Sequence, residues 1–102
     1  MKNYKDYDKQ FIGDSDEARL ILKSESRLEF LNFGEDGSYW AYFVDEFCEI
    51  PDHYTLVHTF SAADTYTTVI FYDDEGKTNS ITTKEIRIYR SGDFGCIVQA
   101  IK

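Results

Sequence analysis

Basic residues are missing from almost half of this chain. Residues 28–76 contain no lysine or arginine, and they carry eleven of the 19 acidic side chains. The rest of the chain has a net charge of +3, against −8 for the whole protein. Because ordinary protein surfaces mix both signs of charge, the acidity here is segregated. A segment of this kind repels nucleic acid and anionic membranes and attracts basic surfaces, so we expect neither direct nucleic-acid binding nor membrane binding.

Cysteine and long hydrophobic runs are also scarce. The two cysteines, Cys48 and Cys96, lie far apart without CxxC spacing, which argues against a disulfide scaffold and a zinc ribbon. The chain has no apolar run of about 18 residues, the length that a membrane-spanning helix needs. The N-terminal stretch MKNYKDYDKQ lacks the apolar region of a signal peptide. Together these features predict a cytoplasmic protein with reduced thiols.

Apolar and aromatic side chains, in contrast, are plentiful. They make up 42% and 17% of the chain, too much for a disordered acidic tail. A chain of 102 residues fits one domain, and no repeat or low-complexity linker divides it. We therefore predict a single domain over residues 1–102, in which residues 1–13 form a flexible arm.

Residues 14–26, DSDEARLILKSES, have the features of a helix. Asp14 or Ser15 can serve as the N-cap, and acidic residues follow in the first turn, where the helix dipole favours them. Ala18, Ile21 and Leu22 fall on one face at helical spacing. The sequence therefore predicts a helix from about residue 14 to residue 26.

From residue 28 onward, β-branched and aromatic segments alternate with turn residues, which is typical of an antiparallel meander. Ile86 and Ile88 alternate with polar residues, as expected for a sheet with one wet face. Residues 38–44, SYWAYFV, are apolar on both faces and predict a central strand. One face would pack on the helix, and the other would need the loop 45–53, a curled sheet or a partner as cover. The expected fold is α+β, with the N-terminal helix packed on five to six strands between about residues 28 and 102.

The acidic segment supplies the candidate binding site. Arginine and lysine pair with carboxylates as they do with phosphates, and exposed aromatic side chains serve as anchors in interfaces. We therefore expect a small non-enzymatic protein without a cofactor, which binds and inhibits a protein partner that has a basic groove. The partner would be a nucleic-acid-handling enzyme or a toxin, by analogy of charge and size with phage anti-defence proteins and immunity proteins. The candidate contact residues are Glu35, Asp36, Asp45, Glu46, Phe47, Glu49, Asp52, Asp73, Asp74 and Glu75.

Two other interpretations of these features stay open. The acidic turns can also serve only to keep an aromatic sheet soluble and its edges unpaired, and an uncovered apolar sheet face would favour a homodimer. A different class of function would be a small metal-dependent or Cys–His enzyme that uses Cys48, His53 and His58. The five-residue spacing of the two histidines places them on opposite faces of a strand, unless the chain bends after Pro51.

Overall fold

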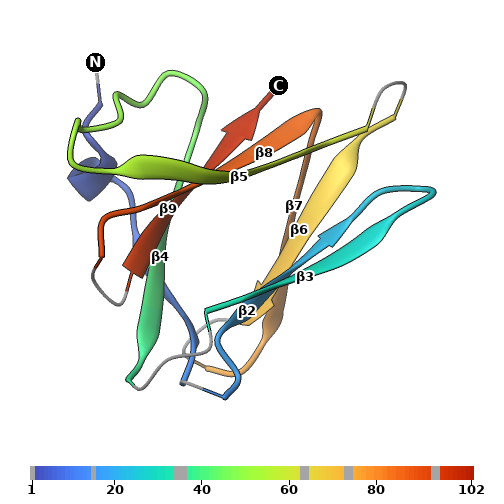
Figure 1. The fold of residues 1–102 in the computed structure, drawn as a ribbon, viewed down its shortest axis with the longest axis horizontal. Coiled ribbons are helices and arrows are strands. Elements are labelled where there is room, and N and C mark those ends of the chain that lie inside the picture. The colour runs from blue at the N-terminus through green and yellow to red at the C-terminus, as the bar shows by residue number, and fades with distance from the viewer. Residues whose placement is uncertain (1, 15, 34–36, 63–64, 73–74, 93–94) are drawn as a thin grey trace.

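The computed structural model describes residues 2–14, 16–33, 37–62, 65–72, 75–92 and 95–102. Within them the chain forms one 3-10 turn and nine strands in two sheets (Figure 1). The elements are η1 (Tyr4–Asp6), β1 (Lys9–Gly13), β2 (Arg19–Lys23), β3 (Leu28–Asn32), β4 (Tyr39–Val44), β5 (Thr55–Ser61), β6 (Thr67–Tyr72), β7 (Thr78–Thr83), β8 (Glu85–Arg90) and β9 (Gly95–Ile101).

The chain passes back and forth between the two sheets. One sheet has five strands in the order β1-β4-β9-β8-β5, and the other has four in the order β3-β2-β6-β7. Strands β4 and β9 pair in parallel, and the other pairs among the described residues are antiparallel. The chain changes sheets between β7 and β8 at Lys84, whose N–H donates to the carbonyl of Ile101 at 3.1 Å. The sheets face each other as two layers, as Figure 1 shows.

The predicted α+β fold is wrong. The described residues contain no helix apart from η1, and nine strands in two sheets replace the expected meander of five to six. The segment predicted as a helix, residues 14–26, contains β2 instead. Its inward side chains Leu20 and Leu22 are fully buried, while Ile21 points outward with the flanking cations. Pairing with β3 on one side and β6 on the other satisfies the backbone, and this tertiary contact outweighs helix propensity.

The signals that resembled a helix start belong to a single turn. The carbonyl of Asp14 accepts the N–H groups of Glu17 at 2.9 Å and Ala18 at 2.6 Å, and the chain then extends into β2. Gly13 precedes this turn with a φ of 132°, and a Cβ there would lie only 2.9 Å from the backbone carbonyl carbon of Glu17. A side chain at this position would strain the turn, so glycine is required.

The main core lies between the two sheets. Phe43 of β4 stacks on Phe71 of β6 with ring centroids 3.9 Å apart, and Tyr39 donates its hydroxyl to the carbonyl of Phe33 at 3.2 Å. The predicted alternation in β8 is confirmed, because Ile86 and Ile88 are fully buried in this core. The other fully buried side chains here include Leu20, Leu22, Ala41, Phe60 and Val69.

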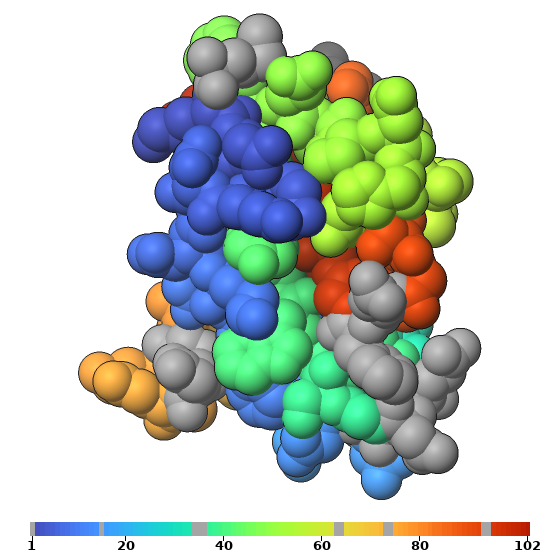
Figure 2. Space-filling model, turned by 90° about the vertical axis from the view of Figure 1, so that its left-hand side faces the viewer, coloured from blue at the N-terminus to red at the C-terminus, as the bar shows by residue number. Residues whose placement is uncertain are grey.

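The outer face of the five-stranded sheet carries a second apolar cluster. We call residues 2–8 and 45–54 the cap, because they cover this face. Tyr4 lies 5.1 Å from Tyr42 and 5.3 Å from Tyr54 between ring centroids, and Ile97 is fully buried below them. A backbone bridge joins Asn3 to Glu49, and Figure 2 shows the N-terminal residues, in dark blue, beside the yellow-green residues that lead into β5.

The cap answers the question of how strand 38–44 is covered. Strand β4 lies between β1 and β9, so the predicted central position is confirmed. Tyr39 and Ala41 face the main core, and Tyr42 and Val44 face the cap. The loop after β4 is one part of the cover. The other part is the N-terminal segment predicted as a flexible arm, which forms η1 and β1 here.

Candidate partner-binding site

A buried side chain of the sheet holds the first turn of the acidic loop, residues 45–54, whose apolar side chains also pack on the sheet. The Nε2 of Gln99 on β9 donates to the carbonyls of Asp45 at 3.2 Å and Cys48 at 3.4 Å. Its Oε1 accepts from the Tyr89 hydroxyl at 3.1 Å. These contacts hold the first turn of the loop in one position on the outer face of the five-stranded sheet.

That first turn directs an aromatic side chain into solvent. The Asp45 carboxylate accepts the N–H of Phe47 at 3.0 Å, and the Asp45 carbonyl accepts the N–H of Cys48 at 3.3 Å. Phe47 is 73% exposed, whereas Cys48 and Ile50 pack into the cap. The loop therefore presents Phe47 outward from an anchored base.

The carboxylates around Phe47 lie on the surface. Asp45, Glu49 and Asp52 are exposed, and Glu46 is half-buried. Burial and then the adjacent Asp45 carboxylate raise the pKa of Tyr7 to about 12. The same contact with Tyr7 is the main cause that lowers the pKa of Asp45, so this carboxylate stays charged well into the acidic range.

The structure brings together five of the ten predicted contact residues. They are the loop residues Asp45, Glu46, Phe47, Glu49 and Asp52, which lie where the chain runs over the outer face of the five-stranded sheet from the end of β4 to the start of β5. Four others, Glu35, Asp36, Asp73 and Asp74, lie outside the described residues. The tenth, Glu75, is exposed and forms an ion pair with Lys77 at 3.5 Å.

Glu75 lies at the opposite end of the sandwich from the acidic loop. Its neighbour Gly76 lines a hollow together with Gly13, and Gly13 pairs with Tyr39 at the start of β4. The loop instead follows Val44 at the end of β4. The acidic segment is therefore continuous in sequence but divided between two ends in space, as Figure 1 shows.

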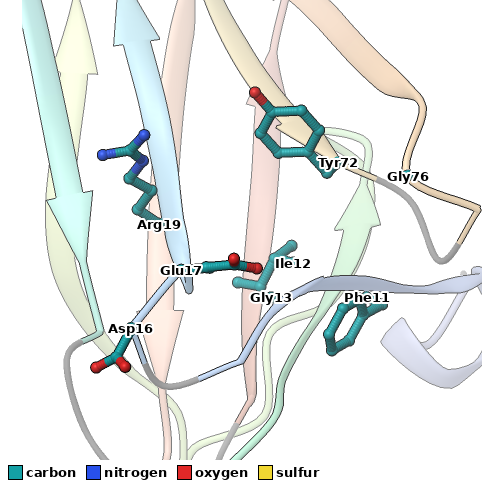
Figure 3. A pocket seen from close by; sticks show the side chains of 8 residues that line it. All are labelled: Phe11, Ile12, Gly13, Asp16, Glu17, Arg19, Tyr72 and Gly76. Carbon is teal, nitrogen blue, oxygen red and sulfur yellow. The ribbon is translucent and has the colours of Figure 1, made fainter.

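The hollow beside Gly76 was not predicted from the sequence. Its volume is about 510 Å³, and its lining combines apolar side chains with charges of both signs (Figure 3). In that view Arg19 and Tyr72 extend in the same direction, and Asp16 points away from them. Arg19 and Tyr72 come from neighbouring strands, β2 and β6, so sequence spacing alone could not bring them together.

The three residues of the enzyme alternative occupy two parts of the fold, with Cys48 and His53 in the acidic loop and His58 on β5. Cys48 lies in the cap, where burial and then nearby carboxylates raise the pKa of its thiol and favour the protonated form. His58 lies on the core side of the sheet, with its ring 6.5 Å from that of Phe60 and its Nε2 3.1 Å from the Glu29 carboxylate. His53 is exposed in the loop. Across the described ranges, no three histidine, cysteine or carboxylate side chains gather as metal ligands.

Comparisons with protein-family models, with curated proteins and with solved structures find no match for this chain. Within the part of the chain that the structure describes, no helix is long and apolar enough to cross a membrane.

Proposed function

We propose that this protein is a non-enzymatic binding protein that docks on a basic protein surface through its acidic loop. The observation that carries the proposal is Phe47, which is 73% exposed between carboxylates on an anchored turn. Large aromatic side chains that enter a partner's pocket dominate the energy of many interfaces. Phe47 is placed to serve as such an anchor.

The charges around Phe47 define the chemistry of the partner. Four acids lie within residues 45–52, a segment without lysine or arginine: Asp45, Glu46, Glu49 and Asp52. Arginine can pair with a carboxylate through two hydrogen bonds and can also stack on an aromatic ring. The partner surface is therefore a groove that contains arginine or lysine and an apolar pocket for Phe47.

The attachment of the loop favours tight binding. Gln99 and the Asp45 turn already hold the loop in place in the free protein. Binding then loses little conformational entropy, because the loop does not have to become ordered. Long-range attraction between the acidic loop and a basic groove would also speed association at low salt.

A basic groove of this kind is typical of proteins that handle nucleic acid, because it binds phosphates. Carboxylates of the acidic loop would occupy phosphate positions, and the protein would then inhibit its partner by competition. Inhibition of a nuclease or a toxin, in the manner of phage anti-defence or immunity proteins, remains the expected biological setting.

A capture experiment with matched variants tests this proposal. The test variant carries Glu46→Gln, Glu49→Gln and Asp52→Asn, and leaves the structural carboxylate of Asp45 intact. Its control carries Asp16→Asn, Glu17→Gln and Glu25→Gln, three exposed acids outside the loop that give the same change in net charge. We expect the wild type and the control to retain a host protein at low salt. The test variant should not retain it, and added salt should release it from the other two.

Two further measurements decide the outcome. The retained protein should lose affinity on Phe47→Ser, and its binding to DNA or RNA should compete with binding to this chain. Equal capture by the test variant and the control would contradict the proposal, because binding would then depend only on net charge. Glu75→Gln in the same assay tests whether the opposite acidic end contributes.

A further inference from the structure

The outer face of the four-stranded sheet carries an uncovered apolar row. Strand register places Phe30 of β3, Ile21 of β2 and Ile70 of β6 side by side across the sheet. Phe30 is 51% exposed, and Leu28 on the same strand is 54% exposed. A contiguous row of this kind across three strands is typical of an interaction surface rather than of a free surface.

The charges on this face are positive. Arg19 and Lys23 point outward on either side of Ile21. Their Cα atoms lie roughly 13 Å apart, because they are four residues apart on one strand. The Arg19 guanidinium lies 5.5 Å from the centre of the Phe30 ring. The other outward positions of these strands carry uncharged polar groups or a phenol, namely Asn32, Thr68, Tyr72, Thr78, Ser80 and Thr82. Among the described residues, the outward strand positions of this face therefore combine an apolar row with two cations and no acid, and the nearest carboxylates, Asp16 and Glu17, line the hollow beside Arg19.

The acidic loop has the complementary chemistry. It presents one large apolar side chain, Phe47, with Glu46 and Glu49 close to it in sequence. The loop and the outer face of the four-stranded sheet lie on opposite sides of the molecule (Figure 1). They cannot meet within one molecule, but they can meet between two.

We propose that the outer face of the four-stranded sheet binds the acidic loop of a second copy of this chain. Phe47 of the incoming copy covers Phe30, Ile21 and Ile70, and its carboxylates pair with Arg19 and Lys23. A symmetric contact between two such sheet faces is disfavoured, because it would bring four cations together with no acid at the outward strand positions. The contact is head-to-tail, so it generates rings or open chains.

This inference rests on the proposed function, because both use the acidic loop as the docking element. A copy whose loop is buried against another copy is blocked from its basic partner. Self-association would therefore store the protein in an inactive form, from which a basic partner releases it by competing for the loop.

Sedimentation velocity of the full chain, from micromolar to near-millimolar concentration, tests the inference. We expect the average mass to rise with concentration at low salt and to fall toward that of a monomer at high salt. A wild type that remains monomeric over the whole range would overturn the inference. A dimer as the largest species would also overturn the inference, if the sheet-face variant described below abolished that dimer and the loop variant did not.

A charge exchange identifies the two surfaces. The sheet-face variant carries Arg19→Glu and Lys23→Glu, and the loop variant carries Glu46→Lys and Glu49→Lys. The sheet-face variant has two negatively charged surfaces, and the loop variant has a loop with no net negative charge to attract its positive sheet face. Each should stay monomeric alone, whereas an equimolar mixture should associate again. Failure of the mixture to associate, with both variants folded by circular dichroism, would contradict the pairing.

Matched controls separate this contact from a general effect of charge. Lys84→Glu with Lys102→Glu changes the net charge as the sheet-face variant does, and Asp8→Lys with Glu25→Lys does the same for the loop variant. All four positions are exposed outside the proposed contact, so both controls should associate like the wild type. If the wild type is monomeric but still captures a basic partner, this inference is wrong and the proposed function stands. If the wild type self-associates but captures no basic partner, the proposed function is wrong and the self-association stands.

Discussion

The two outer faces of the sandwich carry similar apolar side chains but have different covers. On the five-stranded sheet, Tyr42, Val44 and Ile97 point outward and are covered by the cap. On the four-stranded sheet, Phe30 and its neighbours point outward and meet solvent. Outward apolar residues on a strand therefore indicate a cover. For one sheet the chain supplies it, and for the other we propose that a second copy does.

The difference in cover between the two outer faces should have its largest effect on the free energy of unfolding. Two isoleucines that point outward, one on each sheet, allow a direct comparison. Ile97 is fully buried under the cap, and Ile21 is partly exposed on the other sheet. Ile97→Ala should lower the stability by about 2–5 kcal/mol, because it leaves a cavity. Ile21→Ala should lower it by less than about 1.5 kcal/mol, because part of the side chain is already in water. Urea denaturation at a dilute concentration measures both, and equal losses would mean that the cap does not exclude water.

The cap also depends on one polar anchor. Gln99→Leu keeps the approximate volume but removes the donors to the Asp45 and Cys48 carbonyls. We expect a loss of about 1–3 kcal/mol, because these groups would lose their hydrogen bonds in a buried site. Hydrogen exchange of the amides of residues 45–54 should accelerate, while exchange in β2 and β6 should not. Unchanged exchange in the loop would show that Gln99 does not hold it.

Alkaline pH should weaken the cap through Tyr7. Its pKa is about 12 in the folded protein and about 10 when unfolded, so the folded state favours the protonated phenol. Its contribution is complete below pH 10 and is lost between pH 10 and pH 12. Tyr7→Phe should remove that part of the pH dependence, measured as the difference in urea stability from the wild type. A difference between the two proteins that does not change from pH 10 to pH 12 would contradict the raised pKa of Tyr7 in the folded state.

Cys96 provides a comparison from the core side of the same sheet. Burial raises the pKa of its thiol from 9.0 to about 12, so its contribution is complete below pH 9 and is lost above it. Cys96→Ala should therefore change the pH dependence of stability from pH 9 upward. The effect of Tyr7→Phe should begin one pH unit higher, at pH 10.

Local patterns predicted the parts of the fold that depend on local chemistry. Alternation in β8 and the two apolar faces of β4 were visible in the sequence, because side-chain direction has a period of two in any strand. The helix prediction failed at β2, since a segment with four strong helix formers among its five residues also fits a short strand. Its partners β3 and β6 then decided the structure.

Long-range pairing could not be predicted in the same way. The parallel pair of β4 and β9 joins Ala41 to Cys96, and no local pattern encodes a contact at that separation. The charge map predicted an acidic loop, in which the structure exposes Phe47, but it could not show that Glu75 lies at the other end. The row formed by Phe30, Ile21 and Ile70 was hidden for the same reason, because it exists only across paired strands.

The smallest effect on folding should come from the exposed row itself. Phe30→Thr removes a large apolar side chain from an edge strand, where threonine suits the backbone. The free energy of unfolding at a dilute concentration should change by less than about 1 kcal/mol, because Phe30 is 51% exposed in the folded protein. Self-association, measured by sedimentation, should nevertheless fall clearly. A loss of stability similar to that of Ile97→Ala would show that Phe30 belongs to the folded core, and the contrast between the two outer faces would then disappear.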